Sequence, residues 1–159
     1  MIEIITNNVD LKKLIASRGL KPTAQRIVIL RYLMKNQHRH LTAEQIHDAL
    51  HKTTPMLSLT TVYNTLASFV DIGLASTITI TGSAVHYEIE SAPHHHLLCK
   101  KCGRILDVDV QCPNATRRSI QGYQIDEVHG YFIGICRDCL EHNMNTGDSI
   151  RVEKERRKK

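Results

Sequence analysis

The sequence predicts an α+β fold in which an N-terminal winged helix-turn-helix domain precedes a second, small α/β domain. Four amphipathic segments with helix-capping residues occupy the first 72 residues. Two short runs rich in Thr, Ile and Val follow, separated by Gly82-Ser83, which is a hairpin signal. After Pro93 the composition changes, because all the paired cysteines and three consecutive histidines lie downstream of it.

Each predicted helix has an apolar face and a residue suited to one of its ends. The first helix covers 9–18 and ends before Gly19. Thr42, with Gln45 three residues later, fits a capping box for the third helix, and Ser58 can cap the fourth. The buried faces of the second and fourth helices are expected to contain Ile27, Ile29, Leu30, Leu33, Met34, Val62, Leu66, Phe69 and Val70.

Strand signals dominate the rest of the chain. The runs 74–81 and 84–90 form the predicted wing hairpin. Further strands are expected at 97–98, 105–110 and 131–135, and helices at 113–120 and 139–144. We therefore assign a winged-helix domain to residues 1–90, a hinge to 91–93, a metal-binding domain to 94–145, and a basic tail, expected to be disordered, to 146–159.

The charge balance indicates a partner made of phosphates. The formal net charge is +5 and the pI is about 9.0. Much of the excess lies in the last nine residues, which include Arg151, Lys154, Arg156, Arg157, Lys158 and Lys159. A tail of this kind is more often solvated than a specific site, although it would add nonspecific affinity for DNA.

The hydropathy pattern gives no sign of a membrane protein. No apolar run approaches the roughly 18 residues of a membrane span. The opening residues lack the basic flank and long apolar stretch of a signal peptide. We therefore expect a cytoplasmic protein without a membrane partner, in a compartment whose reducing conditions keep thiols free.

Two pairs of cysteines form the strongest chemical signal in the chain. Cys99 and Cys102 are separated by two residues, and so are Cys136 and Cys139. This spacing lets both thiolates of a pair reach one ion from a tight turn, and two pairs complete the tetrahedral shell that Zn2+ prefers. The alternatives are two disulfides or buried thiols. The unpaired Cys112 is more readily explained as a partly buried thiol than as a ligand or redox sensor.

A second set of ligands contains no sulfur. It comprises His40, Glu88, His94, His96 and Asp107. His94 and His96 alternate along one predicted strand, so both can point to the same side. Three imidazoles and two carboxylates suit Fe2+, Mn2+ or Zn2+. Because the set spans both predicted domains, an ion bound there would select one domain arrangement.

The chain resembles the ferric uptake regulator family of bacterial metal-dependent repressors over about residues 8 to 142. No single stretch is decisive, but their order and spacing together are highly specific. The stretches that carry the resemblance are Pro22–Arg26, His40–Ile46, Ser58–Leu66, His86–Glu88, His94–Gly103 and Gly134–Cys139.

The resemblance implies a homodimer whose C-terminal domain is a dimerisation domain. It also implies structural zinc at the four paired cysteines and a regulatory metal site at the five ligands named above. Tyr63 matches the DNA-contacting tyrosine of the family. Including the outer face of the fourth helix and nearby basic residues, the expected contacts to double-stranded operator DNA are Lys12, Lys13, Arg18, Lys21, Thr60, Thr61, Tyr63 and Asn64.

Within the family, the peroxide-responsive branch is the better match. Asp107 stands where that branch has aspartate and the iron-sensing branch usually has glutamate. Glu88 departs from the best-studied peroxide sensors, which have aspartate there. The resemblance implies that oxidation of a ligand histidine releases such sensors from DNA, and His40 and His94 match the positions that are attacked. Pro93 and Asn114 replace the ligands of the family's further metal site, and His129 is out of step with it.

Four functions compete at this point. We favour a metal-dependent DNA-binding repressor that responds to peroxide through Fe2+, or binds Mn2+, at the regulatory site. An iron-, manganese- or zinc-uptake regulator of the same family is the main alternative. A zinc enzyme with Glu88 as general base would leave the helical domain without a role. A zinc-ribbon interaction module without DNA binding is the fourth.

Overall fold

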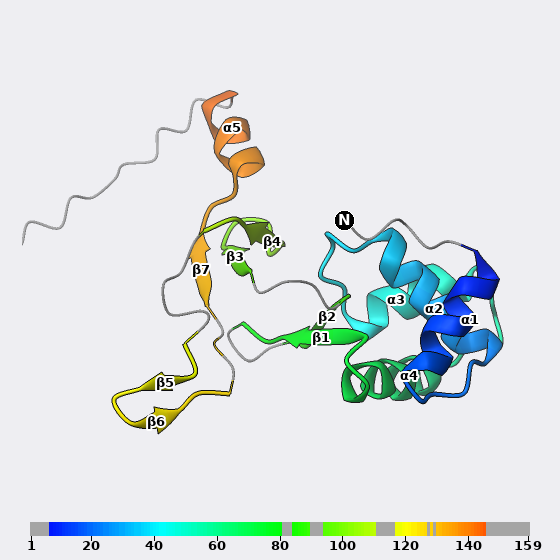
Figure 1. The fold of residues 1–159 in the computed structure, drawn as a ribbon. Coiled ribbons are helices and arrows are strands. Elements are labelled where there is room, and N and C mark those ends of the chain that lie inside the picture. The colour runs from blue at the N-terminus through cyan, green and yellow to red at the C-terminus, as the bar shows by residue number, and fades with distance from the viewer. Residues whose placement is uncertain are drawn as a thin grey trace, which may run out of the picture.

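The computed structural model describes residues 7–80, 84–89, 94–110, 117–126, 128 and 130–145. Figure 1 shows a group of helices on one side and a strand-rich part on the other, with a two-stranded ribbon between them. The elements in order are α1 (Asn8–Ser17), α2 (Ala24–Lys35), α3 (Ala43–His51), α4 (Leu59–Asp71), β1 (Ala75–Ile78), β2 (His86–Ile89), β3 (His95–Cys99), β4 (Ile105–Val108), β5 (Ser119–Ile120), β6 (Tyr123–Gln124), β7 (Tyr131–Gly134) and α5 (Arg137–Asn145).

Side-chain caps begin the four N-terminal helices. The Asn7 side chain accepts from the Val9 amide at the start of α1, and Thr23 does the same for Arg26 at the start of α2. The predicted capping box of Thr42 with Gln45 is present at α3. Ser58 caps α4 by accepting from the Thr61 amide. These four helices are confirmed, with ends that differ from the predicted ones by a residue or two.

One apolar core lies among these helices. Its fully buried members include Leu11, Ile15, Ile29, Leu30, Ile46, Leu57, Val62, Leu66 and Phe69. The β1–β2 ribbon packs on this core through Leu74, Ala75 and Tyr87. Tyr87 also forms a short antiparallel bridge with Leu41, which ties the ribbon to the loop before α3. The ribbon is therefore anchored to the helices at its base.

Two sheets position the residues of interest. In the ribbon, β1 and β2 are antiparallel and Ser76 stands opposite Glu88. The second sheet has the order β4-β3-β7, with β4 antiparallel and β7 parallel to β3. In this sheet His96 is directly opposite Asp107. Side chains of directly opposed residues share a face, so each pair can act together.

A small apolar cluster joins the ribbon to the three-stranded sheet. Ile78 and Ile80 are buried against Ile105, and the half-buried Leu98 packs on them. These contacts bring the end of β1 beside β3 and β4. They place the ribbon residue Glu88 within reach of the histidines at the start of β3.

The predicted helix at 113–120 is wrong for its last residues. Ser119 and Ile120 form β5, which pairs with β6 in a hairpin. The connecting residues Gln121 and Gly122 both have positive φ, at 51° and 85°. Two successive positive values match the twist of a tight hairpin, and local periodicity does not reveal this. The predicted strands that correspond to β1, β2, β4 and β7 are confirmed but shorter than predicted, whereas β3 is longer than the predicted 97–98.

Several predicted features lie outside the described residues. They are the wing tip at 82–83, the hinge at 91–93, residues 113–116, the tail at 146–159, and Cys112, Asn114 and His129. Within the part of the chain that is described, each helix is too short or too polar to cross a membrane.

Candidate metal centres

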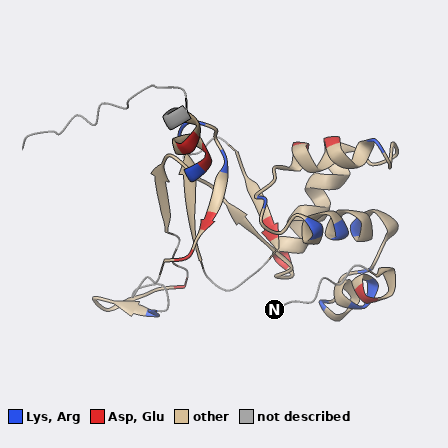
Figure 2. Ribbon diagram, turned by 90° about the horizontal axis from the view of Figure 1, so that it is seen from above, with Lys and Arg blue, Asp and Glu red and all other residues tan. Residues whose placement is uncertain are grey.

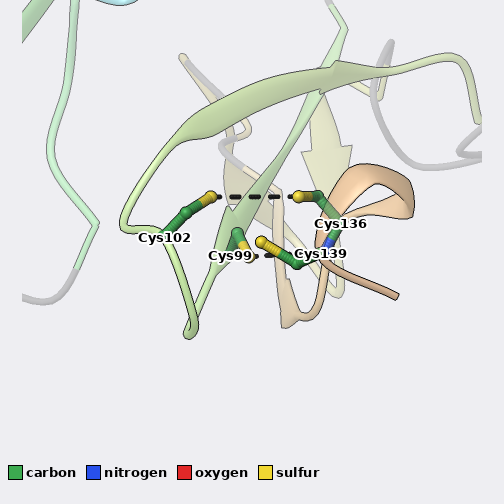
Figure 3. Close-up of side chains that lie close together, drawn as sticks. All are labelled: Cys99, Cys102, Cys136 and Cys139. Carbon is green, nitrogen blue, oxygen red and sulfur yellow. Dashed lines mark hydrogen bonds between the residues drawn. The ribbon is translucent and has the colours of Figure 1, made fainter. Parts of the chain in front are cut away.

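Four cysteine sulfurs meet beside the three-stranded sheet (Figure 3). Cys99 ends β3 and Cys102 lies in the turn that follows, while Cys136 directly precedes α5 and Cys139 lies in its first turn. Their sulfurs all lie within 4.8 Å of one another. All four are free thiols, and Cys102 Sγ and Cys136 Sγ are 3.8 Å apart, well beyond a disulfide bond of about 2.05 Å. The site has the donor atoms of a tetrahedral thiolate centre.

Main-chain hydrogen bonds shape the first half of this site. The Gly103 amide donates to the Cys99 carbonyl at 2.8 Å, and the Cys99 amide donates to the Arg104 carbonyl at 2.9 Å. Gly103 has a φ of +71°, a conformation that glycine adopts without strain. The parallel pairing of β3 with β7 then brings the second cysteine pair alongside. The geometry of the first cysteine pair therefore depends on neighbouring residues, whereas the position of the second pair depends on the tertiary structure.

The surroundings favour the thiolate form of two cysteines and disfavour that of a third. The Cys136 amide donates to Cys99 Sγ at 3.3 Å, and backbone hydrogen bonds of this kind lower the pKa of Cys99 to about 6. The Arg104 guanidinium, 3.4 Å from Cys102 Sγ, lowers the pKa of Cys102. Burial and the nearby sulfurs raise the pKa of Cys139 to about 12. A divalent cation would favour the thiolate form of all four, so the donor set fits such an ion.

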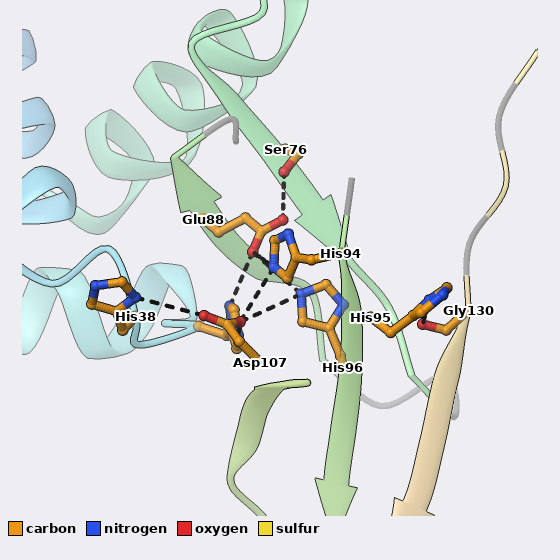
Figure 4. A network of polar contacts seen from close by, with 9 residues as sticks. His38, Ser76, Glu88, His94, His95, His96, Asp107 and Gly130 are labelled. Carbon is orange, nitrogen blue, oxygen red and sulfur yellow. Dashed lines mark hydrogen bonds and ion pairs between the residues drawn. The ribbon is translucent and has the colours of Figure 1, made fainter. Parts of the chain in front are cut away.

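A second cluster joins side chains from the helical part and the sheet (Figure 4). Glu88 comes from β2, Asp107 from β4 and His96 from β3, and His94 directly precedes β3. His40 lies in the loop before α3. Glu88 Oε2 lies 3.3 Å from His40 Nδ1, 3.4 Å from His94 Nε2 and 3.3 Å from His96 Nε2. Asp107 Oδ1 lies 2.7, 3.2 and 3.9 Å from the Nε2 atoms of the same three histidines. The fold thus gathers all five predicted ligands.

The centre of this cluster is shielded from water. The His40 side chain is 0% exposed and that of Glu88 is 9% exposed. Burial by itself lowers the pKa of His40, but the Glu88 and Asp107 carboxylates outweigh burial and raise it. Burial likewise opposes the ionised form of Glu88, yet the neighbouring His40 and His96 rings and the Ser76 hydroxyl hold the pKa of Glu88 far below its usual range. His40 and Glu88 therefore stabilise each other's charged forms.

The donor set of the second cluster fits a divalent cation. Among the described residues, His40 Nδ1 is a buried nitrogen without a hydrogen-bond partner, although Glu88 Oε2 is only 3.3 Å away. Such an orphaned nitrogen is costly unless it binds something, and a cation would be bound by its lone pair. Imidazole and carboxylate ligands without sulfur suit Fe2+, Mn2+ or Zn2+.

Comparisons with known proteins identify the family of this chain. The sequence model of the ferric uptake regulator family matches residues 17–132. The peroxide-responsive repressor PerR of Staphylococcus aureus is 33% identical over 146 residues, covering 88% of this chain and 98% of that protein.

The chain belongs to the ferric uptake regulator family.

Solved structures of the ferric uptake regulator family share its fold. The ferric uptake regulator of Francisella tularensis, solved with iron, aligns with a TM-score of 0.65 at 23% identity, over 77% of this chain and 96% of that one. That of Pseudomonas aeruginosa, solved with manganese, gives 0.65 at 24% identity, over 79% and 97%. Since its relatives are regulators rather than enzymes, this member of the family is a regulator, and the zinc-enzyme alternative is wrong.

In this family member, α4 presents the polar face predicted for it. Thr60, Tyr63 and Asn64 are exposed, and the Tyr63 hydroxyl donates to the Glu44 carboxylate on α3. Thr61 is half-buried and its hydroxyl contacts the capping Ser58 hydroxyl at 2.8 Å. Thr61 is therefore engaged in starting the helix.

The predicted basic contacts differ in their surroundings. Lys12 and Lys13 on α1 and Lys21 beyond it are exposed. Positive charge also lies along α2, as the blue segments of the helices show (Figure 2). Arg18 instead donates to the carbonyls of Ile72 and Gly73 at 3.1 and 2.9 Å. Its guanidinium thus satisfies carbonyls at the end of α4, a role that its position in the sequence does not reveal.

Three residues near the metal centres were missed by sequence reasoning. Arg104 contacts Cys102, and also Cys136 Sγ at 3.6 Å and Asp138 at 2.6 Å. Ser76 donates to Glu88 Oε1 at 2.9 Å, and His38 Nδ1 lies 3.6 Å from Asp107 Oδ2. The one sequence signal that could have revealed the Ser76–Glu88 contact is the predicted pairing of the two ribbon strands, in which these residues stand opposite each other.

Proposed function

We propose that this regulator is a homodimeric repressor that binds double-stranded operator DNA while a metal ion joins its two domains, and that peroxide releases it. The observation that carries the proposal is the five-residue cluster centred on the buried His40 and Glu88, which takes those two residues from one part of the chain and His94, His96 and Asp107 from the other. The domains are those set out from the sequence: 1–90, a hinge at 91–93, 94–145 and a tail at 146–159.

The four-cysteine centre would hold structural Zn2+. Tetrahedral sites with four cysteines are closed to further ligands and serve folding rather than chemistry. Arg104 supports this assignment, because a zinc ion with four thiolates carries a net charge of −2 that a neighbouring guanidinium offsets. The site lies between β3 and α5, so the ion would fasten the last helix to the sheet.

The second cluster would hold the regulatory Fe2+, or Mn2+ in its place. An ion held from both sides binds only the arrangement in which the two domains meet, so it selects that arrangement from others. Two chains in this arrangement would present α4 to the operator. The operating compartment would be the cytoplasm, where DNA and free thiols are both present.

The dimer would form on the exposed apolar side of the sheet domain. Tyr131, Phe132 and Ile133 of β7 are each close to half exposed, and Leu140 of α5 is 42% exposed. In the described sheet, β7 is also an edge strand, whose free backbone groups can pair with a second chain. An apolar edge of this kind is what a subunit interface covers.

Peroxide should modify a ligand histidine only when iron is bound. Fe2+ would supply one-electron chemistry that converts peroxide into an oxidant, whereas Mn2+ does so far less readily. His40 and His94 lie directly on the carboxylates that would share the ion, so they are the nearest targets. We expect a gain of one oxygen on the peptide of either histidine, with release from DNA. The measurement is mass spectrometry with a parallel gel shift after brief peroxide treatment of the Fe2+ and Mn2+ forms.

The manganese form is the control, and it should remain on DNA with both peptides unmodified. An iron form that also stays on DNA, with both peptides intact, would show a plain iron, manganese or zinc sensor instead. That outcome would leave the metal-dependent repressor in place and remove only its response to peroxide.

Operator preference should depend on Tyr63 more than on the lysines. Tyr63 is exposed on the face of α4 that would enter the groove, so Tyr63→Ala removes a contact able to read bases. We expect operator affinity to fall by roughly 1–3 kcal/mol, with metal content unchanged. Lys12→Ala should instead weaken binding to all sequences and reduce the salt slope by about one.

The comparison should use fluorescence anisotropy with operator and scrambled DNA at several salt concentrations. Tyr63→Phe is the matched control, since it keeps the ring and loses only the hydroxyl that contacts Glu44. Unchanged operator binding by Tyr63→Ala would remove α4 from the interface.

A further inference from the structure

Both carboxylates of the five-ligand cluster turn a single oxygen towards the histidines (Figure 4). Glu88 presents Oε2, which all three rings approach within 3.4 Å, and Asp107 presents Oδ1. The other oxygens face elsewhere. Glu88 Oε1 accepts a hydrogen bond from the Ser76 hydroxyl at 2.9 Å, and Asp107 Oδ2 faces His38 at 3.6 Å.

The two outer contacts differ in strength. Ser76 is half-buried and makes a hydrogen bond of ordinary length. His38 has a side chain that is 81% exposed, and its 3.6 Å contact is too long for a hydrogen bond. Water can therefore replace His38 at little cost, whereas the Ser76 contact is protected. Glu88 is the carboxylate whose orientation the protein holds.

The position of Ser76 follows from the ribbon itself. Ser76 on β1 is registered directly opposite Glu88 on β2, so both side chains lie on the same face of the ribbon. A short hydroxyl side chain reaches Glu88 Oε1 without entering the space among the histidines. Thr77, the next residue, stands opposite Tyr87 and points to the other face, where it is exposed.

We infer that Ser76 is a positioning residue that restricts Glu88 to one-oxygen binding and so keeps a coordination position open for peroxide. The inference rests on the regulatory metal site proposed above. Three imidazole nitrogens and two carboxylate oxygens make five donors, one fewer than an octahedral ion accepts. If Glu88 released Ser76 and turned both oxygens inward, it would supply the sixth donor and close the position.

The consequence separates metal affinity from peroxide reactivity. Loss of the Ser76 hydroxyl frees Glu88 to bind through both oxygens, so an ion should be held at least as tightly as before. Peroxide, however, would have to displace a ligand in order to reach the ion. Groups that orient metal ligands commonly change activity by 10–100-fold when they are removed. We therefore expect Ser76→Ala to slow peroxide-dependent histidine oxidation by about 10-fold or more.

The deciding experiment loads full-length protein, with zinc retained at the cysteines, with Co2+ at the second site. Visible absorption of Co2+ weakens when its coordination rises from five to six. We expect weaker bands for Ser76→Ala, and wild-type bands for Ser76→Thr, which keeps a hydroxyl, and for Thr77→Ala. The same variants are then compared as Fe2+ forms for the rate of histidine oxidation.

A Co2+ spectrum unchanged by Ser76→Ala overturns the inference, and so does failure of Ser76→Thr to restore the spectrum. A wild-type iron form that peroxide leaves unmodified would instead refute the proposed peroxide response, and the Co2+ spectra would still decide the role of Ser76. Thermal melting of each variant confirms that the chain is folded. Weaker Co2+ absorption caused by unfolding can then be distinguished from weaker absorption caused by a change in coordination.

Discussion

Cys99→Ser should release one zinc ion per chain and weaken the dimer. Cys99 is fully buried and accepts a hydrogen bond from the Cys136 amide, so it connects the two cysteine pairs directly. Binding of structural zinc contributes folding free energy on the order of 10 kcal/mol or more in small metal domains. Without it, α5 and β7 lose their attachment to β3, and β7 carries the apolar edge assigned to the dimer. This is the largest effect we expect from a single substitution.

Zinc content by mass spectrometry and molar mass by light scattering would measure the effect of Cys99→Ser. Cys112→Ser is the matched control, because it removes a thiol that belongs to neither pair. The control should retain zinc and the dimer. A Cys99→Ser protein with one zinc per chain and an unchanged dimer would contradict the structural assignment.

His96→Ala should abolish metal-dependent operator binding while leaving the structural zinc in place. The His96 ring contacts both central carboxylates, at 3.3 and 3.9 Å, and it stands opposite Asp107 in the sheet. Loss of His96 removes one of the five donors. It also removes a ring that lies beside both the Glu88 and Asp107 carboxylates, so these two negative charges repel each other more strongly. We expect Mn2+ affinity to fall by more than the roughly 100-fold that loss of a ligand-orienting group can cost. With less ion bound, the arrangement that fits DNA is no longer selected.

Calorimetric titration with Mn2+ and gel shifts with and without the ion would test His96→Ala, since Mn2+ avoids oxidation during the measurement. His95→Gln is the control from the same strand. His95 points to the opposite face, where its Nδ1 lies 3.3 Å from the Gly130 carbonyl (Figure 4). The His95→Gln variant should therefore bind Mn2+ with wild-type affinity. Wild-type Mn2+ affinity in His96→Ala would show that the second cluster is not the regulatory site.

Features of the chain that depend on near neighbours were predictable. The capping box of Thr42 and Gln45 and the cap at Ser58 join residues only three apart. The buried faces of α2 and α4 follow from helical periodicity, which the residues of one turn establish. The cysteine spacing likewise specifies a tight turn whose geometry is local. The hairpin of β5 and β6 was missed because its signal is a pair of positive φ values, and 119–120 fit a helical pattern equally well.

The five-ligand cluster occupies an intermediate place. The ligand residue types, and the alternation of His94 and His96 along one strand, indicated which residues could belong to the cluster. The family resemblance then distinguished them from the other histidines and carboxylates. Its geometry depends on the packing of Ile78 and Ile80 against the sheet, which brings Glu88 beside His94 and His96. His40 and Asp107 are 67 residues apart, and no local pattern brings such residues to 2.7 Å.

The sequence by itself determined the fold class, the predicted helix caps, the two candidate sets of metal ligands and the family. Only the tertiary structure decided which oxygen of each carboxylate faces the histidines, that Arg18 binds the end of α4, and that Ser76 orients Glu88. The physical reason is the range of the interactions. Propensity, capping and ligand spacing act over a few residues, whereas a hydrogen bond between side chains depends on strand register and packing that the whole chain establishes together.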